Sequence, residues 1–177
     1  DNKLTRNLYL KLELYYQDLY DIPIEDNDTS SFSALNFSWG YTTIPLRNYG
    51  TGSNYGIEMT LEKFFFNKYY FLITGSLYDS KYVAADKIER NTRYNGNYAA
   101  NILVGKEFNI GRSKTNTLGI SFRGIMAGGR RYTPVDIEKS SEKGYTIRDE
   151  SRPYSAQYPN FSRYDLKISF RRNKKKT

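Results

Sequence analysis

The stretch Asn7-Leu8-Tyr9-Leu10-Lys11-Leu12-Glu13-Leu14-Tyr15-Tyr16 places a leucine at every even position from 8 to 14. Polar and aromatic residues occupy the odd positions between them. Successive side chains of a strand point to opposite faces of its sheet, so the stretch predicts a strand with one apolar and one polar face. A length of about ten residues also suits a tilted strand that crosses a bilayer. The apolar face therefore meets either a protein core or lipid, and these two neighbours imply different functions.

Further segments with the same two-residue period follow, and no helix-period segment of useful length competes with them. The expected strands run roughly over residues 4–20, 55–65, 69–81, 97–108, 117–130 and 161–172. Their polar faces carry the charged residues Lys11, Glu13, Glu58, Glu62, Glu107, Arg123, Arg163, Asp165 and Lys167. The sequence thus predicts an all-β fold, an antiparallel up-and-down meander of about six strands.

The expected connections alternate in length. Residues 66–68 and 111–116 are short, whereas residues 21–48, 83–96 and 134–160 are long and polar. Short turns at one end and long loops at the other are typical of outer-membrane barrels. Aromatic residues gather near both strand ends: Phe64, Phe65, Phe66, Tyr69, Tyr70, Phe71, Phe108 and Phe170 near the turns, and Tyr15, Tyr16, Tyr20, Tyr78, Tyr82, Tyr132 and Tyr164 towards the loops. Two such levels suggest interfacial girdles, while aromatic pairing inside a soluble sandwich is the alternative.

The composition argues against catalysis. The 177 residues include no Cys and no His, which removes disulfides, thiolate metal sites, and the commonest general base and metal ligand. No apolar run approaches the 18 residues of a membrane helix. We therefore expect no enzymatic activity, no catalytic residue, no metal site and no cofactor.

The net charge of +8 is concentrated at the carboxyl end. Five of the last seven residues are basic, and the rest of the chain holds 22 basic against 19 acidic residues. A nearly neutral body weakens the nucleic-acid interpretation that a high pI would otherwise favour. We expect no nucleic-acid partner.

Five motifs occur in order along the chain: residues 14–24 (LYYQDLYDIPI), 54–62 (NYGIEMTLE), 70–82 (YFLITGSLYDSKY), 91–97 (NTRYNGN) and 127–134 (AGGRRYTP). Together they resemble the C-terminal half of the barrel of TonB-dependent outer-membrane receptors of the Bacteroidetes type. The resemblance implies that residues 1–177 form a segment of a 22-stranded transmembrane β-barrel. It also implies that the plug domain, a signal peptide and the last strands are missing, and that Glu58 faces the lumen.

The same resemblance implies a function, which is the energy-coupled uptake of a scarce ligand such as a metal chelate, vitamin or glycan. The implied location is the outer membrane of a Gram-negative cell, with lipid and lipopolysaccharide as neighbours and the TonB complex reached through the absent plug. The isolated segment, with open edges and an exposed aliphatic face, is expected to self-associate. Candidate contacts to an anionic ligand are Arg90, Arg93, Arg130, Arg131, Tyr132, Arg148 and Arg152, although these cations have acidic neighbours with which they can instead form ion pairs.

Two other functions stay open. A soluble β-sandwich that binds carbohydrate or another ligand would pack the aliphatic face on a second sheet within the chain. A single-strand nucleic-acid binder would interleave Tyr and Arg on one face, whereas the basic residues here concentrate in loops and tail.

Overall fold

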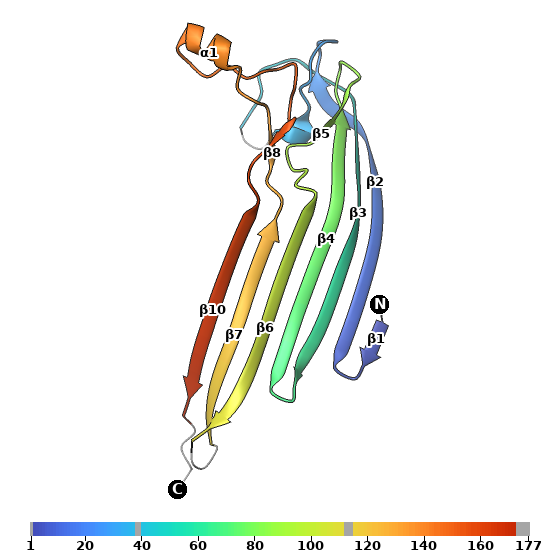
Figure 1. Cartoon of the computed structure of the whole chain (residues 1–177). Helices are drawn as coiled ribbons and strands as arrows, with labels where there is room; N and C mark the ends of the chain where they lie inside the picture. Colours follow the sequence, from blue (N-terminus) through green and yellow to red (C-terminus); the bar gives the residue numbers. More distant parts are fainter. Residues whose placement is uncertain (1, 38–39, 112–114, 173–177) are drawn as a thin grey trace.

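The strands of the chain form one tall antiparallel sheet, with the long connections folded together at one end of it (Figure 1). The computed structural model describes residues 2–37, 40–111 and 115–172. The sheet has eight strands: β1 (Asn2–Thr5), β2 (Leu8–Glu25), β3 (Leu46–Phe66), β4 (Tyr69–Val83), β5 (Glu89–Asn91), β6 (Tyr98–Ile110), β7 (Asn116–Ala127) and β10 (Phe161–Arg171). Their order is β1-β2-β3-β4-β6-β7-β10, and β5 pairs with β4 beyond the end of β6. The predicted all-β meander is thus confirmed.

The strand boundaries differ from those expected at three places. The first expected strand is divided, because a turn at Arg6 and Asn7 folds β1 back onto β2. β2 continues to Glu25 and β3 begins at Leu46, so this pair extends well into the connection that was expected to be irregular. The pairing survives there through irregular register between Leu19 and Pro23. The expected six strands correspond to the six long ones, and β1 and β5 are short additions.

The register places most apolar residues of the six long strands on one face, with Leu72, Leu103 and Ile125 on the other. One row across the sheet reads Leu10, Leu61, Ile73, Ile102, Gly124 and Tyr164. The adjacent row on the opposite face reads Lys11, Thr60, Thr74, Asn101, Ile125 and Arg163. All nine charged residues predicted for the polar face lie on it, as their positions in the register require.

The turn between β3 and β4 explains how two long strands reverse within two residues. Asn67 and Lys68 both have positive φ, 53° and 67°. Two successive left-handed residues match the right-handed twist of the flanking strands and close the hairpin tightly. This end of the sheet therefore carries short turns, as predicted.

The buried core lies at the loop end of the sheet. Ile24 of β2 and Tyr82 of β4 are fully buried, with Ala84 and Ala85 beside them. The hydroxyl of Tyr82 donates a hydrogen bond to the Ser31 carbonyl at 3.1 Å, which satisfies its polar end inside the core. The long connections therefore pack against the sheet and contribute residues to this core.

Short elements organise those connections. They are the 3₁₀ turn η1 (Ala34–Asn36), the paired strands β8 (Arg131–Tyr132) and β9 (Ala156–Gln157), and the helix α1 (Ile137–Lys143). The side chain of Asp136 caps the first turn of α1, and Gly144 ends the helix in a left-handed conformation. No helix among the described residues has the length and apolarity needed to span a membrane.

The tyrosines expected at the loop-end level are distributed differently. Tyr82 is buried in the core, Tyr15 and Tyr78 lie on the polar face, and Tyr164 belongs to a central row of the apolar face. Tyr16 and Tyr55 do lie next to each other at the upper limit of the apolar face. The last five residues of the predicted basic tail, 173–177, lie outside the described residues.

Candidate ligand pocket at the loop end

Backbone contacts between loops hold this end of the molecule together. The amide of Arg93 donates to Asn36 Oδ1 at 2.7 Å, which joins the β4–β6 connection to the β2–β3 connection. The amide of Arg131 donates to the Arg93 carbonyl at 2.9 Å and so adds the β7–β10 connection. Residues from three separate loops are therefore fixed relative to one another.

Glycines allow two close backbone approaches, one between two of these loops and one within the β7–β10 connection. A Cβ on Gly128 would lie 1.7 Å from the Gly96 carbonyl oxygen, and a Cβ on Gly129 would lie 1.9 Å from the Tyr158 carbonyl oxygen. Side chains at these positions would force the backbones apart, because real Cβ atoms do not approach oxygen that closely. The Gly-Gly pair that precedes Arg130 in the sequence is explained by this contact.

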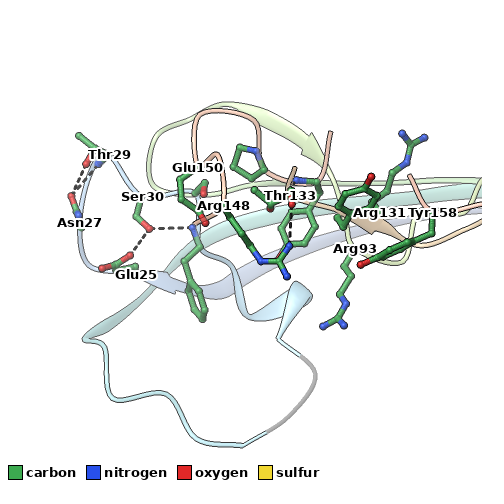
Figure 2. A pocket seen from close by; sticks show the side chains of 15 residues that line it. Glu25, Asn27, Thr29, Ser30, Arg93, Arg131, Thr133, Arg148, Glu150 and Tyr158 are labelled. Carbon is green, nitrogen blue, oxygen red and sulfur yellow. Dashed lines mark hydrogen bonds between the residues drawn. The ribbon is translucent and has the colours of Figure 1, made fainter. Parts of the chain in front are cut away.

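A pocket of about 590 Å³ lies among the three loops (Figure 2). Its volume is within the usual range for small-molecule sites. The lining residues are Glu25, Asn27, Thr29, Ser30, Ser31, Phe32, Arg93, Arg131, Tyr132, Thr133, Arg148, Glu150, Pro153, Tyr154 and Tyr158.

The charged groups are separated along the pocket. Figure 2 shows Glu25 and Glu150 towards one end, Arg131 and Arg93 towards the other, and Arg148 between them. Glu25 accepts a hydrogen bond from the Ser30 hydroxyl, which in turn accepts from the Phe32 amide at 3.1 Å. The acidic end is thus held in place by its own loop.

Two arginines keep most of their donors available. Arg148 Nη1 donates to the Thr133 carbonyl at 3.0 Å. Arg131 donates through Nε to the Asn95 carbonyl at 3.1 Å and through Nη2 to Asn97 Oδ1 at 2.8 Å. Neither guanidinium forms an ion pair within the described part of the chain. Because each guanidinium carries five N–H donors, both side chains can donate further hydrogen bonds to an anionic group.

Tyrosine rings form part of the wall. The rings of Tyr132 and Tyr158 lie with centroids 4.3 Å apart and planes inclined by 32°. Tyr154 packs edge-on against Tyr82 of the core, and burial raises the pKa of the Tyr154 hydroxyl above its usual value. The three rings offer apolar faces with polar tips.

The structure brings together four of the seven residues predicted as ligand contacts, namely Arg93, Arg131, Tyr132 and Arg148. The other three lie elsewhere. Arg90 pairs with Asp86 at 2.7 Å, Arg152 pairs with Asp149 at 2.7 Å, and the Arg130 guanidinium lies 5.5 Å from the centre of the Tyr94 ring. Arg90 and Arg152 therefore form ion pairs with acidic neighbours, which was the alternative to ligand binding.

These two ion pairs stabilise their own loops. Burial would raise the pKa of Asp86, but hydrogen bonds from Arg90 and the Ile88 amide hold it below its usual value. The Ser151 hydroxyl and Arg152 together lower the pKa of Asp149 to about 2. Both carboxylates are ionised in the native state at neutral pH.

Sequence reasoning missed the acidic end of the pocket and all of its aromatic residues except Tyr132. Glu25 and Glu150 have no pattern in the sequence that sets them apart from other loop carboxylates. Tyr154 and Tyr158 were visible in a segment rich in Tyr and Pro, residues 153–159, but their position depends on the β8–β9 pairing. A short strand pair of two residues each leaves no periodic signal.

The geometry is suited to binding. Arginine donors, carboxylate acceptors and tyrosine rings surround a partly open space. Within residues 2–37, 40–111 and 115–172, no three acidic side chains come together in a way that would hold a metal ion. Comparison with family models, with curated proteins and with solved structures found no match to this chain.

Proposed function

We propose that this chain is a wall segment of a TonB-dependent outer-membrane receptor with a 22-stranded barrel, and that its loops contribute to the capture of a scarce ligand for uptake. The observation that carries the proposal is the exposed apolar face of the sheet. Leu14 is 81% exposed, and Leu166 and Ile168 of β10 are 68% and 65% exposed. A face of this kind requires an apolar neighbour.

The height of this face suits a bilayer. Along β2 it runs from Leu8 to Tyr16, a span of roughly 26 Å at about 3.3 Å per residue. Because strands of outer-membrane barrels are tilted, about 9–11 residues cross the bilayer, and the nine residues from Leu8 to Tyr16 match that length. Above Tyr16 the same face becomes polar at Asp18, whose carboxylate accepts from the Tyr16 and Tyr20 hydroxyls. The apolar face thus ends in hydrogen-bonded tyrosines, which suit a membrane–water interface.

Two further features support the proposal. Short turns lie at one end of the sheet and folded loops at the other, which is the asymmetry of outer-membrane barrels (Figure 1). The outer strands β1 and β10 each pair on one side only within the described residues, so the sheet can continue in both directions.

The soluble sandwich is the competing proposal. It requires a second sheet over the apolar face, and the only other sheet among the described residues is the β8–β9 pair at the loop end. The single-strand nucleic-acid binder gains no support from the polar face, where Arg163 pairs with Asp165 at 3.0 Å and Lys11 pairs with Glu13 at 2.7 Å.

The experiment uses the absence of Cys from the sequence. Single cysteines replace Leu14 and Ile168 on the apolar face, and Glu58 and Asn101 on the polar face. Each is labelled with bimane in the full chain reconstituted into vesicles whose acyl chains are brominated. We expect strong quenching at positions 14 and 168 and weak quenching at positions 58 and 101. Equal quenching on both faces, or none on either, would overturn the proposal.

A further inference from the structure

The pocket has a chemical polarity that narrows what can occupy it. Three guanidinium groups and two carboxylates line it, which leaves one formal positive charge. Arg148 and Arg131 have donors available for an anion, as described above. A ligand with one negative charge would balance the pocket, whereas a ligand with several negative charges would meet Glu25 and Glu150.

The two pocket carboxylates favour a ligand with hydrogen-bond donors. Glu150 forms no ion pair within the described residues, and Glu25 is engaged with Ser30. An ionised carboxylate only accepts hydrogen bonds. Because Glu150 lies beyond Arg148 at the acidic end of the pocket in Figure 2, the occupant needs hydrogen-bond donors as well as an anionic group. Hydroxyl groups supply such donors without adding charge.

The tyrosine wall offers a contact surface for a ring or another flat group of the ligand. Tyr158 is 53% exposed, and its ring is braced by Tyr132 with centroids 4.3 Å apart. The Tyr158 backbone is fixed as well, because its amide donates to the Arg130 carbonyl at 3.0 Å. A braced, half-exposed tyrosine ring can receive a ligand ring without prior reorganisation.

We propose that the pocket formed by the three loops binds a hydroxylated ring that carries a single carboxylate. The carboxylate lies against Arg148, the ring lies against Tyr158, and the hydroxyl groups point towards Glu150. An acidic sugar and a hydroxylated aromatic acid share this chemistry. The inference rests on the proposed function for its role in uptake, but the binding itself depends only on the loops.

The test measures binding to the full chain in detergent micelles by ligand-observed NMR, which detects millimolar affinities. Glucuronate and 2,3-dihydroxybenzoate are the two acids, with glucose and catechol as their uncharged counterparts. Binding of glucuronate alone identifies the sugar source, and binding of dihydroxybenzoate alone identifies the aromatic source. Either result supports the proposal. Failure of both acids to bind, or equal binding of an acid and its uncharged counterpart, overturns it.

Variants locate the site. Arg148→Gln is expected to lower the affinity for the acid about tenfold or more, because a charge-assisted hydrogen bond to the carboxylate is lost. Arg130→Gln is the matched control, since Arg130 belongs to the same β7–β10 connection and its guanidinium lies over Tyr94 outside the pocket. Tyr158→Leu tests the ring, and Glu150→Gln should weaken the acids that carry hydroxyls more than it weakens benzoate. Equal losses in Arg148→Gln and Arg130→Gln would contradict the assignment.

The two proposals fail separately. If the acids bind but bimane quenching shows no lipid at the apolar face, the ligand site stands and the membrane receptor does not. If quenching marks the apolar face but no acid binds, the receptor proposal stands and the ligand class is wrong. Circular dichroism of each variant confirms that the sheet is retained, so that a loss of binding reports on the pocket.

Discussion

The ring of Tyr154 meets the ring of Tyr82 edge-on, with centroids 6.1 Å apart and planes inclined by 78°. Tyr82 belongs to strand β4, and Tyr154 belongs to the β7–β10 connection. This contact helps to attach the longest loop to the sheet, and it also positions the pocket wall because Tyr154 is a lining residue.

Replacing Tyr154 with Ala should release the β7–β10 connection. The variant loses the ring contact and part of the buried surface, so proteolytic cleavage within residues 134–160 is expected to accelerate several-fold. Limited proteolysis with mass spectrometry measures it. Tyr145→Ala is the matched control, because Tyr145 lies in the same connection and is 65% exposed. Equal cleavage of both variants would show that Tyr154 does not anchor the loop.

Replacing Tyr82 with Phe should be milder. The ring contact is kept, but the Ser31 carbonyl loses the hydroxyl that donates to it at 3.1 Å. A buried acceptor left without its donor costs about 1–3 kcal/mol. Hydrogen exchange should therefore increase at the amides of residues 30–37, with little change in β6 and β7.

Acidification should loosen the turn at Asp149. Its pKa in the folded chain is about 2, below the usual value near 3.9 for an unfolded chain. A depressed pKa means that this stabilisation is complete above about pH 4 and is lost as the pH falls towards 2. Amide exchange at Ser151 and Arg152 should increase over that interval. In Asp149→Asn the exchange should be fast already at pH 5 and show no such step.

Adding a side chain at Gly128 should open the pocket. The Cβ of Gly128→Ala would lie 1.7 Å from the Gly96 carbonyl oxygen, so the β4–β6 and β7–β10 connections must move apart. Binding of the acidic probe should be lost while the circular dichroism of the sheet is unchanged. Gly75→Ala is the control, because a Cβ there meets no atom within 4 Å. Undiminished binding in Gly128→Ala would separate the pocket from this contact.

The exposed apolar face predicts that the chain associates in water. Leu12, Leu14, Leu166 and Ile168 all lie on this face and are more than half exposed. Light scattering without detergent should detect oligomers or aggregates, and detergent should disperse them. Replacing Leu14 and Ile168 with Lys should reduce association. A monodisperse monomer of the unmodified chain in water would contradict this prediction.

The sequence predicted the sheet well because each strand carries its own evidence. Alternation along Leu8–Leu14 and along residues 164–170 fixes both the strand and its face, since a shift by one residue would expose the wrong side chains. The extension of β2 to Glu25 was not predicted, because Asp21 and Pro23 interrupt the period there and the pairing tolerates them through irregular register.

The pocket was predicted only in part. Arg93, Arg131 and Arg148 were predicted as loop cations together with Arg90 and Arg152, and the prediction did not separate the two groups. Those two have acidic partners three or four residues away, a spacing that can be read locally. The pocket arginines differ because their surroundings come from other loops, and no local pattern reports contacts between residues so far apart.

The order of the strands also has a consequence for how the molecule forms. Each long strand pairs with a neighbour along the chain, so the sheet can grow hairpin by hairpin through contacts of modest sequence separation. The pocket instead joins residues 25–32 to residues 148–158, and those contacts carry a larger loop-closure cost. Its loops are therefore expected to settle last, after the final strand has paired, which makes ligand binding a kinetic marker for a completely folded chain.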